Sequence, residues 1–166
     1  NLSTSYHVLF SLCWVFIATF IVFPGIFFDS YWSFLNKESL FPWYIQITIL
    51  TFNVCDTIGR KLGGMYMLST GKVIAGSVLR SIFVLLVILI ALDDKHDTYF
   101  FEADWFKIVN LILFSITNGY IQHNADLAPQ FVKEDQREQV GFLNGFFIGL
   151  GIVIGSIITI PIGTAM

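Results

Sequence analysis

The sequence predicts an all-α integral membrane protein with five transmembrane helices, and three observations support this fold class. Of its 166 residues, 55% are hydrophobic and only 13% are charged, whereas soluble domains average about 25% charged residues. The mean hydropathy is +0.74, and the apolar residues fall into five stretches. Each stretch is long enough, at about 1.5 Å per residue, to cross a hydrocarbon core of about 30 Å as a helix. The stretches lack the alternating pattern of about 10 residues that is typical of a membrane β-barrel.

The five expected spans form a single transmembrane helical domain over residues 1–166, and short polar joints separate them. They cover approximately residues 6–28, 42–68, 73–92, 105–128 and 140–162. The first span is not a signal peptide, because it lacks a basic N-terminal region and a small-residue cleavage motif. Pro24 and Pro129 lie late in the first and fourth spans, where proline kinks or ends a helix. Trp43 and Trp105 begin the second and fourth spans, as interfacial anchors do.

Lysine and arginine near the span ends set the expected orientation in the membrane. The joints between spans two and three and between spans four and five carry Arg60, Lys61, Lys72, Lys133 and Arg137. The opposite side carries Lys37, Lys95 and Lys107. Because basic residues concentrate on the cytoplasmic side, this bias places residue 1 inside and Met166 outside.

The second span contains the polar residues on which the functional interpretation depends. Asn53, Asp56 and Arg60 occupy positions i, i+3 and i+7, within about 60° of one another around a helix. A charged residue at the centre of a membrane helix costs about 2.5–3.5 kcal/mol. Gln46 and Gly63 extend the same polar stripe. We expect this stripe to line a water-filled cavity and to bind a polar solute.

Two other interpretations of this pair of charges remain open. An acid four residues before a base, as in Asp56 and Arg60, is a favourable helical ion pair that can simply hold helices together. Arg60 can also extend to the inner interface, since Lys61 follows it and the span ends nearby. Solute binding is the leading hypothesis, and the alternative is a membrane receptor or assembly subunit with a structural ion pair.

Spans three and four carry further polar residues. Arg80, within the third span, either joins a polar network, extends to the interface or contacts the substrate. Asn118, Gln122 and Asp126 recur every four residues and form a second polar helical face. His123 is either a proton carrier or a hydrogen-bonding residue. Substrate binding is expected from Asn118 and Gln122, and a network or proton role from the others.

The fifth span is rich in glycine. Gly141, Gly145 and Gly149 recur at four-residue steps, and Gly151 and Gly155 form a second pair with the same spacing. A stripe of small residues lets another helix approach closely. We therefore expect helix packing at Gly141, Gly145 and Gly149, including packing by helices from outside this chain.

Several functions are not expected from this sequence. A net charge of −3 without a basic run argues against nucleic-acid binding. No second histidine or cysteine is suitably spaced for a metal site, and no cofactor is expected. An intramembrane enzyme is disfavoured, because paired catalytic aspartates and a serine–histidine pair are not apparent.

Residues from all five spans resemble the equilibrative nucleoside transporter family, specifically its C-terminal half. The second span carries the most specific element, Phe52-Asn53-x-x-Asp56-x-x-Gly59-Arg60. The weaker elements are Phe23-Pro24-Gly25, Arg80 with Phe83-Val84, Asn118-Gly119-Tyr120 and Glu138-x-x-Gly141. Two positions depart from the family pattern. Many members have a large aromatic residue where this chain has Thr57, and some have proline where it has Leu85.

The resemblance implies an eleven-helix transporter related in fold to the major facilitator superfamily. This chain would supply helices seven to eleven, half of such a bundle, with Asn53, Asp56 and Arg60 facing a central cavity. The chain begins with asparagine rather than methionine, and we expect it to be the C-terminal part of a larger transporter. Its expected partners are a nucleoside or nucleobase substrate, the lipid bilayer and the missing N-terminal helices of the same protein.

The expected function is facilitative transport of nucleosides or nucleobases by alternating access. Asp56 would accept hydrogen bonds from ribose hydroxyls, while Arg60 and Asn53 donate to ribose or base heteroatoms. Proton coupling is an open alternative, in which Asp56 or Asp126 titrates during transport. The plasma membrane is the expected location, with an internal membrane as the alternative.

Overall fold

The computed structural model describes residues 2–29, 32–33, 41–93, 103–127, 130 and 132–165. This part of the chain contains seven α-helices and no β-strand. The helices are α1 (Leu2–Val22), α2 (Gly25–Asp29), α3 (Phe41–Met65), α4 (Thr70–Leu79), α5 (Ser81–Asp93), α6 (Asp104–Asp126) and α7 (Glu134–Ala165). The predicted all-α fold is confirmed.

The seven helices correspond to the five predicted spans. α1 and α2 together form the first span, which is interrupted at Phe23 and Pro24, so this proline ends a helix as predicted. α4 and α5 together form the third span, and Arg80 lies at their junction. α3, α6 and α7 are the second, fourth and fifth spans. Pro129, Lys37 and Lys95 lie outside the described residues.

Among the described residues, three segments are long and apolar enough to cross a membrane. They are Ser5–Phe27, Thr70–Ile90 and Glu134–Pro161. α3 and α6 have 25 and 23 residues, so their length also matches a hydrocarbon core at about 1.5 Å per residue. They are less apolar because they carry the polar residues of spans two and four. These two most polar helices pack mainly against each other.

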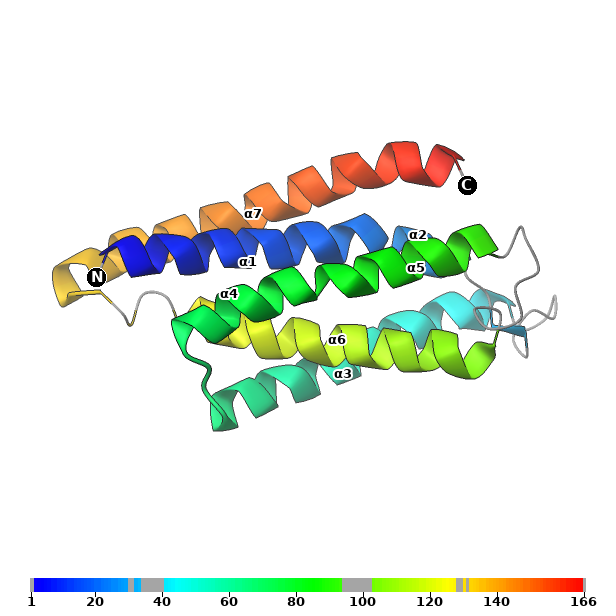
Figure 1. Cartoon of the computed structure of the whole chain (residues 1–166), viewed down its shortest axis with the longest axis horizontal. Coiled ribbons are helices and arrows are strands. Elements are labelled where there is room, and N and C mark those ends of the chain that lie inside the picture. The colour runs from blue at the N-terminus through cyan, green and yellow to red at the C-terminus, as the bar shows by residue number, and fades with distance from the viewer. Residues whose placement is uncertain are drawn as a thin grey trace.

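α1 lies between α7 on one side and α4 and α5 on the other, and α7 packs along it (Figure 1). α4, α5 and α6 also contact α1, whereas α3 packs mainly against α6. The start of α1, the ends of α3 and α6, and the starts of α4 and α7 lie at one end of the bundle, while α7 ends at the other (Figure 1). This alternation matches five consecutive spans, and the sidedness in the membrane stays a prediction.

α3 and α6 approach so closely that their backbones touch at two glycines. A Cβ atom on Gly59 would lie 2.1 Å from the Ile116 carbonyl oxygen, and one on Gly119 would lie 1.9 Å from the Asp56 carbonyl oxygen. No real Cβ atom can occupy these positions, so the packing requires glycine at both. The contact places Asp56 directly beside α6.

α7 approaches α1 through the second pair of glycines in its sequence. Cβ atoms on Gly151 and Gly155 would lie 2.6 Å from the Cys13 carbonyl oxygen and 2.8 Å from the Ile17 carbonyl oxygen, respectively. No neighbouring atom lies within 4 Å of a Cβ built on Gly141, Gly145 or Gly149. These three glycines therefore do not pack against the described part of this chain, because α7 turns them away from α1. Packing there by a helix from outside the chain stays a prediction.

A polar layer crosses the bundle between two apolar clusters. The first cluster consists of Val22, Ile26, Phe27, Trp32, Tyr44, Phe52, Val87, Leu111 and Phe114. The second consists of Val8, Leu9, Leu12, Val15, Val73, Ile121, Ala125, Val132 and Val140. Between the clusters lie Thr19 on α1, Asn118 on α6 and Arg80 at the α4–α5 junction. Several helices thus each place a polar residue at the same level of the bundle.

Candidate functional site

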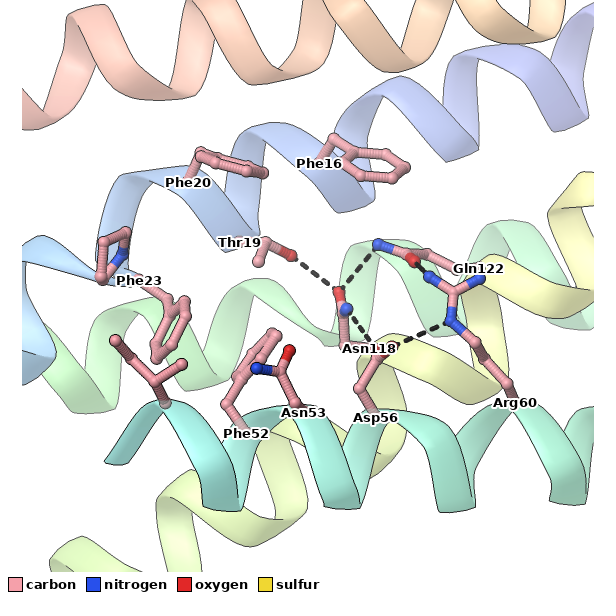
Figure 2. Close-up of a pocket in the computed structure, with 12 residues that line it drawn as sticks. Phe16, Thr19, Phe20, Phe23, Phe52, Asn53, Asp56, Arg60, Asn118 and Gln122 are labelled. Carbon is pink, nitrogen blue, oxygen red and sulfur yellow. Dashed lines mark hydrogen bonds and ion pairs between the residues drawn. The ribbon is translucent and has the colours of Figure 1, made fainter. Parts of the chain in front are cut away.

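A cavity of about 350 Å³ lies between α1 and α3 at the level of the polar layer. α6 contributes two polar residues to its wall (Figure 2). The lining residues are Phe16, Thr19, Phe20, Phe23, Pro24, Ile49, Phe52, Asn53, Asp56, Arg60, Asn118 and Gln122. A cavity of this size, with apolar walls and a few polar groups, is typical of a site for a small molecule.

The charged pair predicted on the second span lies in the wall of this cavity. Arg60 Nε donates to Asp56 Oδ2 at 2.9 Å, and the side chains are 41% and 14% exposed, respectively. A second carboxylate, that of Asp126, lies 3.6 Å from Arg60 Nη1. The pair is therefore not sealed between helices, and its charged groups can reach a solute in the cavity.

The ion pair belongs to a closed ring of hydrogen bonds between α3 and α6 (Figure 2). Asn118 Nδ2 donates to Asp56 Oδ1 at 2.6 Å, and Gln122 Nε2 donates to Asn118 Oδ1 at 3.3 Å. Arg60 Nη2 donates to Gln122 Oε1 and closes the ring. A carboxylate only accepts hydrogen bonds, so the amide nitrogen of Asn118 must face Asp56. This assignment fixes the orientation of both amides.

Aromatic side chains form the apolar part of the wall. Phe23 stacks on Phe52, with ring centroids 4.1 Å apart and an interplanar angle of 13°. Phe16 and Phe20 stack at 6.5 Å along α1. Asn53 lies next to Phe52 on the cavity side of α3 (Figure 2). The cavity thus offers hydrogen-bonding groups in one region and flat apolar surfaces in another.

The structure brings together five of the six residues predicted to bind substrate: Asn53, Asp56, Arg60, Asn118 and Gln122. Gln46 is exposed and does not line the cavity. Of the α3 residues that line the cavity, Ile49 is the first in the chain. The helical period that placed Gln46 on the polar stripe could not show where the cavity stops.

The three residues predicted for a network or proton role lie outside the cavity wall. Arg80 is buried against α1 and α6. His123 packs beside Gly64 of α3, with its Nε2 atom 3.4 Å from the position of a Cβ on that glycine. Asp126 pairs with Arg60 and accepts a hydrogen bond from Asn144 of α7 at 3.3 Å. A proton role for any of them stays a prediction.

Sequence reasoning missed the contribution of the first span to the site. Thr19, Phe16 and Phe20 line the cavity, and Thr19 Oγ1 lies 2.7 Å from Asn118 Oδ1. A signal was present, because Phe16, Phe20 and Phe23 recur at helical spacing around a hydroxyl in an otherwise apolar segment. Nothing in that pattern showed which helix the stripe faces.

The fold and the site define a helical membrane protein in which a polar and aromatic cavity lies among the spans. The model of the family described as "Nucleoside transporter" matches residues 2–163. The chain therefore belongs to the nucleoside transporter family, and the resemblance found in its sequence is confirmed.

Individual relatives support the same assignment. The chain is 29% identical over 154 residues to equilibrative nucleoside transporter 1 of Homo sapiens, covering 89% of this chain and 34% of the relative. It is 27% identical over 151 residues to equilibrative nucleotide transporter 1 of Arabidopsis thaliana, covering 90% and 32%. It is also 27% identical over 163 residues to adenosine transporter 1 of Crithidia fasciculata, covering 90% and 30%. The chain thus spans about a third of the length of these curated relatives.

Proposed function

We propose that this chain forms the substrate-binding half of a facilitative transporter for nucleosides or nucleobases that works by alternating access. The observation that carries the proposal is the division of one cavity into a hydrogen-bonding ring and a stacked aromatic wall. A nucleoside has the same division, because a flat base is joined to a ribose with several hydroxyl groups. Membership of the nucleoside transporter family supports the same substrate class.

The ring can accept hydrogen bonds from the ribose in addition to its internal ones. Asp56 Oδ1 and Oδ2 each accept a single hydrogen bond from Asn118 or Arg60, so each retains a lone pair for a hydroxyl. Hydrogen bonds to a charged group contribute about 1.5–3 kcal/mol each. They offset the hydration that the ribose loses on entering the cavity. Arg60 and Asn53 are the donors available to ribose or base oxygen and nitrogen atoms.

The same ring explains how apolar surroundings tolerate two ionic side chains. Arg60 is compensated by Asp56 and Gln122 and lies near Asp126. A charged group that is paired and hydrogen-bonded costs far less in an apolar environment than an isolated one. Substrate binding therefore adds hydrogen bonds to groups that are already paired rather than satisfying stranded groups, which keeps binding weak enough for release.

The remaining helices of a transporter would complete this cavity. The wall described here comes from α1, α3 and α6, and the chain spans about a third of its curated relatives. In transporters of this kind, one bundle rocks against another around a site at the middle of the membrane. We therefore propose that N-terminal helices of the same polypeptide face α1 and α3 across the cavity.

Uptake by vesicles that contain the natural full-length polypeptide tests this function. We expect saturable uptake of labelled adenosine that stops at equal concentrations inside and outside. Unlabelled adenosine should compete at least about tenfold better than 2′,3′-dideoxyadenosine, because one hydrogen bond to a charged group is worth roughly that factor. Vesicles without protein are the control. Absence of saturable uptake would leave the receptor or assembly role as the better explanation.

The same vesicles distinguish facilitative from proton-coupled transport. An imposed pH difference is expected to leave the final internal concentration of adenosine equal to the external one. Accumulation above that level, abolished by a proton ionophore, would show coupling. Labelling of surface proteins in intact cells would test the proposed plasma-membrane location against an internal membrane.

A further inference from the structure

Arg80 is the least exposed charged side chain among the described residues, at 1%. Its Nη1 atom donates to the Val15 carbonyl oxygen at 3.1 Å and to Thr19 Oγ1 at 3.0 Å. Its Nη2 atom donates to the Phe114 carbonyl oxygen at 3.3 Å, and the guanidinium carbon lies 4.4 Å from the centre of the Phe114 ring. Among the described ion pairs, none includes Arg80.

Packing alone does not explain an arginine in this place. A buried cation without a carboxylate beside it is costly, and an apolar side chain of similar volume usually serves a core better. The Nε atom of Arg80 has no hydrogen-bond partner, so the surroundings do not even satisfy every donor. The residue also lies between the two apolar clusters of the bundle. A specific contact must therefore account for the charge, and the contact with Thr19 leads to the cavity.

A directed chain of hydrogen bonds runs from Arg80 to Asp56. Arg80 donates to Thr19 Oγ1 at 3.0 Å, and Thr19 Oγ1 lies 2.7 Å from Asn118 Oδ1. Asn118 Nδ2 then donates to Asp56 Oδ1 at 2.6 Å. The chain begins at a cation and ends at an anion, the arrangement in which neighbouring hydrogen bonds strengthen one another.

The direction of the chain follows from the chemistry of its ends. Asp56 can only accept, so Asn118 turns its nitrogen toward Asp56 and its oxygen toward Thr19. Two oxygen atoms 2.7 Å apart need a proton between them, and only the Thr19 hydroxyl has one. Arg80 can only donate, so it takes the acceptor side of the hydroxyl. Thr19 Oγ1 also lies 2.7 Å from the Val15 carbonyl oxygen, so its one proton is shared between that oxygen and Asn118 Oδ1. Arg80 donates both to Thr19 Oγ1 and to the Val15 carbonyl oxygen, which favours the hydroxyl orientation toward Asn118.

We propose that Arg80 is a positioning residue that acts on the cavity through Thr19 and Asn118. Arg80 fixes the orientation of the Thr19 hydroxyl, and that hydroxyl fixes the orientation of the Asn118 amide. The amide in turn holds the Asp56 carboxylate in the orientation that binds the ribose. Arg80 does not touch the substrate, since it is buried and does not line the cavity. The inference rests on the proposed function, because it assigns Asp56 to ribose hydroxyls.

The proposal predicts that variants lose their preference for adenosine over 2′,3′-dideoxyadenosine, rather than binding both compounds more weakly. If Asp56 is no longer held, a nucleoside loses its ribose contact, whereas a nucleoside without those hydroxyls has no contact to lose. In Thr19→Val, one methyl group replaces the hydroxyl at nearly equal volume. We expect the inhibition constant for adenosine to rise about tenfold, the worth of one such hydrogen bond. The constant for 2′,3′-dideoxyadenosine is expected to change less than about twofold.

Inhibition of labelled adenosine uptake by the two compounds, in vesicles with the full-length polypeptide, measures both constants. Thr19→Ser retains the hydroxyl. It is therefore expected to keep the wild-type ratio of the two inhibition constants, that for 2′,3′-dideoxyadenosine divided by that for adenosine. Arg80→Lys should lower the ratio as Thr19→Val does, because a lysine amine cannot reach the three acceptors of the guanidinium fork. The double variant should be no worse than Thr19→Val, since both residues act in series. Ser115→Ala is the matched control: its buried hydroxyl lies on α6 but donates to the Leu111 carbonyl oxygen at 2.6 Å.

Each outcome decides the proposal. A wild-type ratio in Thr19→Val, or equal weakening of both compounds, would overturn it and leave Arg80 a purely structural residue. If Arg80→Lys does not fold, Thr19→Val and Thr19→Ser still decide. If the wild-type protein transports adenosine without preferring it to the dideoxy compound, the ribose contact of the proposed function fails. The inhibition constants of the wild-type protein alone reveal that failure, before any variant is measured.

Discussion

Asp56→Asn is expected to reduce the rate of nucleoside uptake by at least about a hundredfold while the protein still reaches the membrane. The substitution keeps the shape of the side chain but replaces one carboxylate oxygen with an amide nitrogen, which then faces one of two donors, Arg60 Nε or Asn118 Nδ2. It also leaves Arg60 without its closest counter-charge. Two charge-assisted hydrogen bonds to ribose, worth about 1.5–3 kcal/mol each, are weakened or lost together.

The measurement is the initial rate of labelled adenosine uptake, divided by the amount of transporter in the membrane. Asp135→Asn provides the control, because Asp135 is an exposed acid in the first turn of α7. It is expected to transport at the wild-type rate. An Asp56→Asn protein that transports at more than half the wild-type rate would remove this carboxylate from the mechanism.

Gly119→Ala is expected to have the largest effect on folding. A Cβ atom at this position would lie 1.9 Å from the backbone oxygen of Asp56. Backbone atoms cannot turn aside as a flexible side chain can, so α3 and α6 must separate. Overpacking of this kind typically costs about 1–3 kcal/mol or more. The separation also stretches the hydrogen bond between Asn118 and Asp56, so surviving protein should bind nucleosides poorly.

Thermal stability of the purified full-length protein and its yield as a single species in detergent measure this effect. Gly71→Ala is the matched control, because Gly71 lies in the first turn of α4 and a Cβ there meets nothing within 4 Å. The control should be neutral or slightly stabilising, since alanine favours helix more than glycine by about 1 kcal/mol. Equal stability of the two variants would show that α3 and α6 do not pack this tightly.

Much of the fold could be predicted from the sequence because the membrane imposes a simple rule. Backbone polar groups in lipid must be satisfied within a helix, so apolar length alone predicts where helices run. The grouping of Asn53, Asp56 and Arg60 was predictable for a similar reason, since their spacing places them on one helical face. The interruption at Pro24 followed from the missing amide hydrogen of proline.

The partners of these residues could not be predicted. Asn118 lies 62 residues from Asp56 in the chain, and only the packing of α3 on α6 brings them together. Periodicity also does not show which face of a helix meets which neighbour. It favoured Gln46 equally with Asn53, although only Asn53 lines the cavity. It led us to expect packing at Gly145, although Gly151 is the glycine that packs against α1.

The backbone contact between α3 and α6 couples the two helices that hold the polar ring. We expect two helices in backbone contact at Gly59 and Gly119 to tilt together as one unit. In the proposed alternating-access movement, the carboxylate and guanidinium on α3 would therefore keep their distances to the amides on α6. A nucleoside would contact the same arrangement of binding groups whether the cavity opens to the cytosol or to the exterior. We expect its dissociation constants measured from the two faces to be nearly the same.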